Sequence, residues 1–574
     1  MCGIFGLTNF NSIESSLAKE ALNALSHRGP DGYGEYCDDS VYIGHRRLSI
    51  LDLSDHGKQP MLNFSKDIVI AVNGEIYNFN SLREELEINH IFISASDSEV
   101  VLHGYVEWGI EGLISRLDGM YAISIYDKQK EKLYLIRDRV GIKPLYYGVV
   151  GGRLSWASEL KSLKIFFGET LSTDYTACYD YLTYLYIPAP KTLYKDVYKL
   201  EPGHYLDVNV ASGKFVKRRY WRLETRECSE SPVTAKRKVY ELMEKSVKEQ
   251  LVADVPISFF LSGGIDSSAV VAIAAKIHSD VNAYTIGFED KAHDETEYAK
   301  LAACHFAINH NIKVLSHGEI DKLFENIHHW YDEPFADTSC FPTYMVSKEA
   351  RRNSVVALTG DGGDEVFGGY RWYKKFKFIR GLSLSSLSFL RLLNPILNRY
   401  SKTKKIAAKA ELFFLGDLEL YTKLLGGMLK SEKEAYRVKW DIPEDYDDYW
   451  NFRQFYRPDL SPVKRLQYLD FHTYLPDDIL TKVDRVSMAV SLECRVPFLS
   501  KDIVEYLFSL PESVTLPNGE LKGLMKQALE ELLPVEILKR PKRGFSIPRR
   551  KVKTKKDGGL LMKQEEIGIR FFNF

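Results

Sequence analysis

Short apolar segments alternate with turn residues up to about residue 200 of the chain. The segments 67–72, 121–126, 131–136 and 143–148 are rich in β-branched and aromatic residues and are bounded by Gly, Asn or Asp. Apolar residues follow helical spacing only at 14–25 and 98–108. This pattern predicts antiparallel sheets that are covered by a few helices.

The pattern changes from Pro232 onward, where predicted helices and strands alternate. Apolar residues at helical spacing over 238–251 lead into the continuous apolar run 255–261. Because strands and helices keep alternating after this run, we expect a parallel, doubly wound sheet. The further predicted elements are a helix at 267–277, a strand at 283–288, a helix that begins at Asp294 with Glu297 as its capping partner, and strands at 311–315 and 355–360.

Length and charge restrict the function further. A chain of 574 residues is too long for one core, and the polar segment 224–232 is the best candidate for a linker. Lys plus Arg number 77 and Asp plus Glu number 78, so the net charge is -1. Such a balance argues against nucleic-acid and anionic-membrane partners and favours small-molecule substrates.

Cysteine usage and hydropathy bear on the cellular location. The seven cysteines have no metal-binding spacing, and an odd number argues against a disulfide framework. No signal peptide and no apolar run of membrane-spanning length is recognisable. We therefore expect a cytoplasmic protein that does not associate with membranes.

The chain begins MCGIFG, which places Cys2 directly behind the initiator methionine. Removal of the methionine would give Cys2 its own α-amine. Because the pKa of an α-amine is about 7.7–8.0, part of it is unprotonated near neutral pH and can accept the thiol proton. Taken alone, Cys2 could also be a cysteine without a chemical role, because chain ends are usually frayed. The apolar stretch that follows argues against fraying, because it predicts a strand.

Four further segments accompany Cys2: HRGPDG (27–32), HRRLSI (45–50), VNGEIYN (72–78) and SDSEV (96–100). As a set they closely resemble the glutaminase domain of class II, N-terminal nucleophile glutamine amidotransferases, which is a four-layered αββα sandwich. The resemblance implies that Cys2 is the nucleophile and that Asn73 and Gly74 form the oxyanion hole. It also implies that Arg47 binds the α-carboxylate of glutamine, and that Glu75 and Asp97 bind its α-ammonium.

A second motif, LSGGIDSS (261–268), joins a predicted buried strand to a predicted helix. Backbone N–H groups at such a turn bind anions, although a glycine-rich turn without function is the alternative. The motif lacks the lysine of a Walker A loop. TGDGGDEVFGGY (359–370) follows another strand, and the carboxyl ends of parallel strands meet at one edge of a sheet. We therefore expect Asp266 and Asp364 to share Mg²⁺.

The C-terminal part resembles the ATP-pyrophosphatase domain of asparagine synthetases, and the order of the two motifs matches the glutamine-hydrolysing form. The resemblance implies a glutaminase domain at 1–210, a synthetase domain with a helical C-terminal part at 232–550, and an atypical basic tail at 551–574. The implied substrates are glutamine, aspartate and ATP. The residues implied to bind ATP and its pyrophosphate are Leu261, Ser262, Gly263, Gly264, Asp266, Ser267, Ser268, Ile286, Thr359 and Gly360.

Three further charged residues have expected roles in the synthetase chemistry. Asp361 stands where relatives carry a glutamate that supports the chemistry. Many relatives have lysine at the position of Arg485, and Lys482 lies three residues earlier on the same helical face. Either residue could neutralise phosphate charge; we expect Lys482 to do so, with Arg485 as its positioning partner.

Alternatives to asparagine synthesis share much of this chemistry. The acceptor carboxylate could instead belong to a uronic acid of a surface polysaccharide or to a peptide. A β-lactam synthetase needs no ammonia donor, so Cys2 argues against it. An idle nucleotide-binding or regulatory module is consistent with the short basic C-terminus, but not with the intact motifs around Cys2, Asn73, Asp266 and Asp364. The oligomeric state is left open, with a homodimer as one arrangement.

Overall fold

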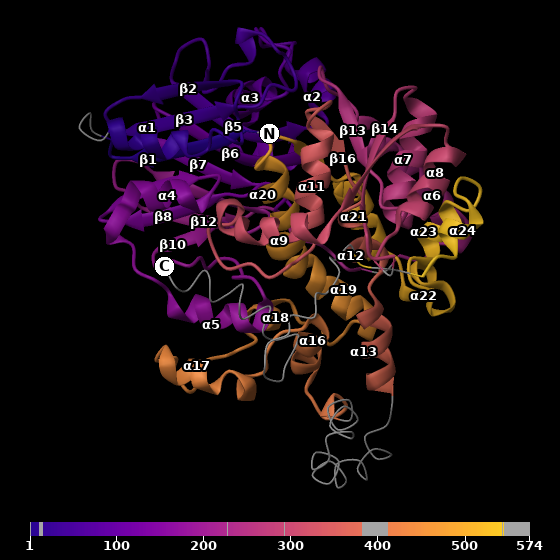
Figure 1. Ribbon diagram of the computed structural model, residues 1–574. Coiled ribbons are helices and arrows are strands. Elements are labelled where there is room, and N and C mark those ends of the chain that lie inside the picture. The colour runs from indigo at the N-terminus through magenta and orange to yellow at the C-terminus, as the bar shows by residue number, and fades with distance from the viewer. Residues whose placement is uncertain are drawn as a thin grey trace.

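A computed structural model describes residues 2–10, 15–226, 228–291, 293–381, 411–541 and 544. Figure 1 shows the N-terminal half (residues 2–219), coloured indigo to magenta, beside the C-terminal half (residues 232–541), with helix α20 (Thr481–Met488) close to their boundary. The basic tail predicted at 551–574 lies outside the described residues. None of the described helices is long and apolar enough to span a bilayer.

The N-terminal half contains two six-stranded antiparallel sheets. The first has the order β10-β8-β9-β1-β3-β2, with β1 (Gly3–Thr8) paired to both β3 and β9. The second has the order β12-β11-β7-β6-β5-β4. The remaining strands are β2 (Gly32–Cys37), β3 (Val41–Arg47), β4 (Met61–Leu62), β5 (Ile68–Ile76), β6 (Gly119–Asp127), β7 (Lys132–Arg137), β8 (Tyr146–Val150), β9 (Arg153–Ala157), β10 (Val197–Lys199), β11 (His204–Asn209) and β12 (Phe215–Arg219).

These two sheets pack face to face between helices. Ile4 and Ile43 of the first sheet share a buried core with Val69 and Ala122 of the second. Helices α1 (Ser15–Asn23) and α4 (Leu160–Phe167) cover the outer face of the first sheet, whereas α2 (Phe79–Leu86) and α3 (Glu99–Arg116) cover that of the second. The four layers confirm the αββα sandwich expected from the sequence.

The C-terminal half is built on a five-stranded parallel sheet with the order β15-β14-β13-β16-β17. Alternate residues of its strands enter different cores: Ala283 packs with the cluster that includes helices α6 and α7, and Tyr284 packs with the cluster that includes α11. Helices therefore cover both faces, which confirms the doubly wound prediction. The elements are β13 (Ile257–Phe260), β14 (Asn282–Phe288), β15 (Asn309–Leu315), β16 (Val356–Leu358), β17 (Glu493–Arg495), α6 (Pro232–Gln250), α7 (Ile265–Ile277), α8 (Thr296–His305) and α11 (Cys340–Ala350).

Several elements differ from the sequence prediction. Helices α2 and α4, and the strands β2–β4 and β9–β12, had no predicted counterpart. Helix α6 begins at Pro232 rather than 238, because Ser231 caps it by accepting the N–H of Thr234. The predicted capping by Asp294 is wrong: α8 begins at Thr296, and Asp294 accepts the Thr296 hydroxyl at 2.7 Å. Strand β17 was not predicted, because its three residues Glu-Cys-Arg have no strand pattern.

Candidate active sites

Cys2, the predicted nucleophile, lies just before β1 and is buried. Its backbone nitrogen donates to Asn73 Oδ1 at 2.9 Å, and this is the nitrogen that would become the α-amine after methionine removal. Burial raises the pKa of the Cys2 thiol, and the charges of Glu493 and Glu75 raise it further. The thiol therefore needs a base beside it, and an α-amine held by Asn73 meets that need.

Asn73 and Gly74 lie next to each other in β5, as the predicted oxyanion hole requires. Because Asn73 Oδ1 is turned to Cys2, its Nδ2 group is left as the donor, with a long 3.5 Å hydrogen bond to Ser158 Oγ. Gly74 has a φ of 152°, and a Cβ atom there would lie 1.9 Å from the carbonyl oxygen of Met120. Only glycine fits this position.

The predicted glutamine-binding residues are all buried. Asp97 Oδ2 accepts the Ile76 N–H at 2.7 Å, and burial raises the pKa of Asp97 to about 6. Burial also raises the pKa of Glu75, and the charge of Asp97 adds to this effect, so the two carboxylates are neighbours. The Arg47 guanidinium donates to the carbonyl oxygens of Ser54, at 2.8 Å, and Asp52.

The raised pKa of Asp97 predicts how glutamine binding should depend on pH. If Asp97 binds the α-ammonium, it must be ionised, and a pKa raised to about 6 means that it becomes protonated below that pH. We expect the KM for glutamine to rise by about tenfold per pH unit below pH 6. Steady-state glutaminase assays between pH 5 and 8 measure this. Asp97→Asn should raise KM at neutral pH and remove the slope, whereas a flat wild-type profile would contradict the assignment.

A large cleft, of about 1140 Å³, opens at the carboxyl ends of β13, β14 and β16. Most of the residues predicted to bind ATP line it, which matches the edge where parallel sheets bind ligands. Gly263 and Ser268 are not among the lining residues, and Ser268 is fully buried with its N–H bonded to the Gly264 carbonyl. The predicted residues that line the cleft are Leu261, Ser262, Gly264, Asp266, Ser267, Ile286, Thr359, Gly360, Asp361, Asp364 and Lys482.

The two predicted phosphate loops touch each other. A Cβ atom on Gly360 would lie 2.7 Å from the Ser267 nitrogen, so these loops approach through their backbones. Gly264 caps helix α7, and the Ser267 hydroxyl donates to the Gly264 carbonyl at 3.2 Å. The first N–H groups of α7 therefore point to the cleft as an anion site.

Lys522 joins the two predicted metal ligands. Its ammonium is 2.6 Å from Asp364 Oδ1 and is hydrogen-bonded to Asp266 Oδ2, and its side chain is 4% exposed. Lys522 was not predicted as a site residue, because an isolated lysine in the turn before α23 (Gly523–Ala528) carries no motif. Among the described residues, no group of three or more His, Cys, Asp or Glu is arranged to hold a metal ion.

Lys482 reaches the same cleft from helix α20. Its Nζ lies 3.6 Å from Asp337 Oδ2 and 3.8 Å from Asp361 Oδ1. Burial alone would lower the pKa of Lys482, but the charges of Asp337 and Asp361 outweigh it and raise the pKa. Lys482 is therefore a permanent cation beside Asp361, as the prediction for phosphate neutralisation requires.

Comparison with known protein families matches both halves of the chain. Residues 238–560 match the asparagine synthase family, and residues 1–221 match the glutamine amidotransferase domain. The first match covers more than half of the sequence. The chain belongs to the asparagine synthase family.

Relatives are similar over nearly the whole length of this family member. Asparagine synthetase (glutamine-hydrolyzing) 1 of Bacillus subtilis is 33% identical over 561 residues, which cover 96% of this chain and 87% of the relative. A putative asparagine synthetase (glutamine-hydrolyzing) of Mycobacterium bovis is 32% identical, with 93% and 84% covered. A putative asparagine synthetase (glutamine-hydrolyzing) 2 of Methanocaldococcus jannaschii is 33% identical, with 87% and 100% covered.

Arg485 lies at the boundary between the two halves of this asparagine synthase family chain. It is not among the described residues that line the cleft. Its Nη2 is 2.7 Å from Asp332 Oδ2 and 3.3 Å from Glu159 Oε2, and its Nε donates to the Trp330 carbonyl. The structure therefore separates Arg485 from Lys482, its predicted partner in the phosphate chemistry.

This position makes a stability effect the expected result of replacing Arg485. Arg485→Met removes a cation shared by the buried Glu159 and the half-buried Asp332. Glu159 keeps Arg28 and Lys161 as partners, so we expect the free energy of unfolding to fall by about 1–3 kcal/mol. Urea denaturation measures this change. A role at the phosphates predicts the opposite pattern, with unchanged stability and a large loss of ATP-dependent turnover.

Arg28 of the HRGPDG segment links Cys2 to helix α20. Its Nε donates to the Cys2 carbonyl at 3.1 Å, and its Nη1 lies 2.8 Å from both Glu159 Oε1 and Asp484 Oδ2. All of these side chains are buried. Arg28 had no predicted role, because its partner Asp484 is 456 positions away in the sequence. The two halves of the chain are therefore in direct contact at the nucleophile.

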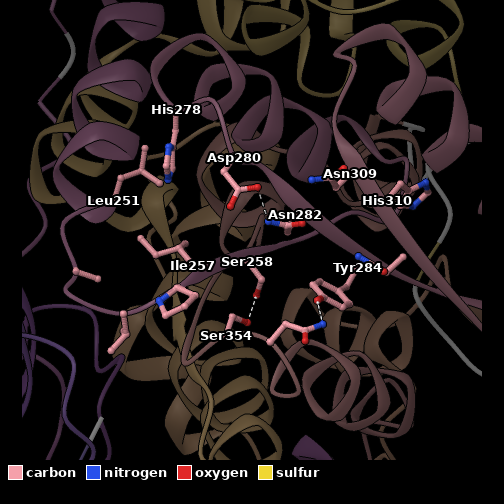
Figure 2. A pocket seen from close by; sticks show the side chains of 15 residues that line it. Leu251, Ile257, Ser258, His278, Asp280, Asn282, Tyr284, Asn309, His310 and Ser354 are labelled. Atoms are coloured by element: carbon pink, nitrogen blue, oxygen red, sulfur yellow. Dashed lines mark hydrogen bonds between the residues drawn. The ribbon is translucent and has the colours of Figure 1, made fainter.

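A second cavity, of about 640 Å³, lies at the amino ends of β13, β14 and β15 (Figure 2). Ser258 and Ser354 are hydrogen-bonded there at 2.9 Å, as are Asp280 and Asn282 at 2.8 Å. This is the edge of the sheet opposite to the cleft. None of the predicted site residues is among those that line it.

Proposed function

We propose that this protein is a glutamine-dependent asparagine synthetase. Glutamine, aspartate, ATP and water are converted to asparagine, glutamate, AMP and pyrophosphate. The observation that carries the proposal is the presence, in one chain of the asparagine synthase family, of a buried Cys2 held by Asn73 and a cleft lined by the SGGIDSS loop. The direct contact of the halves at Cys2 supports a joint reaction.

The N-terminal half releases ammonia from glutamine. Cys2 Sγ attacks the amide carbon of the side chain while its proton passes to the α-amine of Cys2. Asn73 Nδ2 and the Gly74 N–H stabilise the oxyanion, ammonia leaves with the transferred proton, and water hydrolyses the thioester to glutamate. Arg47 binds the α-carboxylate of glutamine, and Glu75 with Asp97 binds its α-ammonium.

The C-terminal half activates the acceptor. The β-carboxylate of aspartate attacks the α-phosphorus of ATP, and pyrophosphate leaves. Ammonia then attacks the acyl carbon of the adenylate, and AMP leaves as asparagine forms. The N–H groups at the start of α7 hold the pyrophosphate, and Lys482 and Lys522 balance its charge where the cleft places their ammonium groups.

The carboxylates of Asp266 and Asp364, which contact the Lys522 ammonium, are also suited to hold Mg²⁺. Both carboxylates reach one ammonium group, so they converge on a single point beside the loop. Mg²⁺ takes one or two carboxylates together with phosphate oxygens and water, and it would neutralise charge on the pyrophosphate. These two residues would hold the ion. A cytoplasmic location and a homodimer remain predictions from the sequence.

One assay with two donors tests the proposed reaction. Purified protein is incubated with ATP, Mg²⁺, aspartate and either glutamine or ammonium chloride, and asparagine, glutamate, AMP and pyrophosphate are quantified. With either donor, we expect one AMP and one pyrophosphate for each asparagine formed. With glutamine as the donor, we also expect one glutamate for each asparagine. Glutamate release without AMP or asparagine would mean that aspartate is not the acceptor.

A further inference from the structure

Strand β17 of the C-terminal half brings a buried arginine to the glutamine pocket. Arg495, the last residue of β17, is 1% exposed. Its Nη1 donates to the carbonyl oxygens of Gln250, at 2.7 Å, and Val252, at 2.8 Å, and its Nε donates to Glu493 Oε1 at 2.7 Å. These contacts fix the plane of the guanidinium group.

The remaining nitrogen of this guanidinium faces the other half of the chain. Arg495 Nη2 lies 3.5 Å from Oε2 of Glu75, the carboxylate predicted to bind the α-ammonium of glutamine. Three buried carboxylates gather here: Arg495 pairs with both Glu75 and Glu493, and Asp97 accepts the N–H of Ile76, the residue after Glu75. Arg495 opposes the effect of the other two carboxylates on the pKa of Glu75. Burial keeps the pKa of Glu75 raised even so, and removal of the arginine would raise it further.

The main chain of the same residue reaches the ATP cleft. Arg495 is paired with Leu358 of β16, and its carbonyl accepts the N–H of Thr359 at 2.9 Å. Thr359 lines the cleft where the second phosphate loop begins. Arg495 therefore contacts a glutamine-site carboxylate with its side chain and the cleft with its backbone.

We propose that Arg495 is a positioning residue of the glutamine site, supplied by the C-terminal half, which holds the Glu75 carboxylate in place for the α-ammonium of glutamine. The inference rests on the proposed function in one respect, that glutamine is the substrate of Cys2. Loss of the arginine leaves Glu75 among carboxylates without its cation, so glutamine binds more weakly while the ammonia-dependent reaction continues.

A double-mutant cycle between Arg495 and Glu75 tests this. The variants are Arg495→Met, Glu75→Gln and the double variant, and the readouts are glutamate release at varied glutamine and asparagine synthesis from ammonia. We expect Arg495→Met to raise the KM for glutamine at least about tenfold, with ammonia-dependent kcat within about twofold of wild type. When Glu75 is already replaced by Gln, adding Arg495→Met should raise the KM for glutamine by less than about twofold over that of the Glu75→Gln variant.

Two outcomes would overturn the proposal. Either the two substitutions raise KM by independent, multiplying factors, or Arg495→Met lowers both reactions equally with an unchanged KM. Because Arg495 also holds two backbone carbonyls, Arg495→Lys is the second variant. It retains a cation, so its KM should lie between those of wild type and Arg495→Met, and a KM equal to that of Arg495→Met would count against the proposal.

Arg139→Met is the matched control. Arg139 is also buried and donates to backbone carbonyls, those of Leu117 and Ile114, but it makes no contact with Glu75. Its substitution should leave the KM for glutamine unchanged in both backgrounds. The double-mutant cycle measures the KM for glutamine from glutamate release, so it tests the role of Arg495 even if aspartate is not the acceptor. Absence of glutamate release from the wild-type protein would instead overturn the proposed function.

Discussion

Cys2→Ala is expected to abolish asparagine formation from glutamine and to leave formation from ammonia intact. The substitution removes the only atom proposed to form the thioester, so no other residue of the pocket replaces it. Loss of a nucleophile from an acyl-transfer site lowers the rate by at least about a thousandfold. The C-terminal cleft keeps all of its lining residues, so AMP and asparagine should still form when ammonium chloride is the donor. Both donors are compared by quantifying asparagine and AMP.

The control for this substitution is Cys178→Ala. Cys178 is a free, buried cysteine like Cys2, but it lies in helix α5 (Tyr175–Tyr184). Its removal should leave both activities close to wild type. Glutamine-dependent synthesis by Cys2→Ala at more than a tenth of the wild-type rate would exclude Cys2 as the nucleophile. A loss of both activities would indicate that the substitution damages the contact between the halves.

Lys522→Met is expected to give the reverse pattern, with a loss of synthesis from both donors and continued glutamate release. The Lys522 ammonium bridges Asp266 and Asp364 at the site proposed for the pyrophosphate. Without it, the two carboxylates and the leaving pyrophosphate lose one of the positive charges that balance them. One preorganised electrostatic contact of this kind contributes about 10²–10³-fold to kcat. AMP formation with aspartate and ammonia measures the loss.

Lys526→Met provides the matched control. Lys526 also lines the cleft, but its partner is Glu520, at 2.6 Å, rather than the two aspartates. We expect less than about a tenfold loss, because an exposed pair of this kind contributes little. Equal losses in the two variants would mean that Lys522 acts only through the overall charge of the cleft. Lys522→Arg should recover part of the activity, since it returns a cation to Asp266 and Asp364.

The parts of the sites that the sequence predicted are local in the chain. Asn73 with Gly74, and Ser262 through Asp266, are short runs in which glycine, serine and acidic residues follow a strand, so their geometry is set by neighbours. Strands β5, β6 and β7 of the N-terminal half and β13 to β16 of the C-terminal half were recognised for the same reason, because their apolar patterns are continuous, whereas β2–β4, β9–β12 and β17 were not. Apolar patterns do not locate the ends of a helix: α6 begins at Pro232, six residues before its apolar pattern, because Ser231 caps it there.

The residues that the sequence did not reveal act over long separations. Lys522 meets Asp266 across 256 positions, and Arg28 meets Asp484 across 456. Neither pairing has a local pattern, because each depends on how the sheets and helices pack. Arg485 shows the converse case. Arg485 and Lys482 lie three residues apart in helix α20, as predicted. In the packed structure, however, the Arg485 side chain contacts Asp332 and Glu159 and does not line the cleft.

The buried charges around Arg28 also limit how this enzyme could be re-engineered. Arg28 and Glu159 come from the N-terminal half, and Asp484 and Arg485 come from the C-terminal half. A chimera that replaced the N-terminal half with an amidotransferase domain lacking these two residues would leave Asp484 without its cation and Arg485 without Glu159 in the protein interior. The halves are therefore not interchangeable modules, and a productive exchange must transplant the interlocking charges together with the domain.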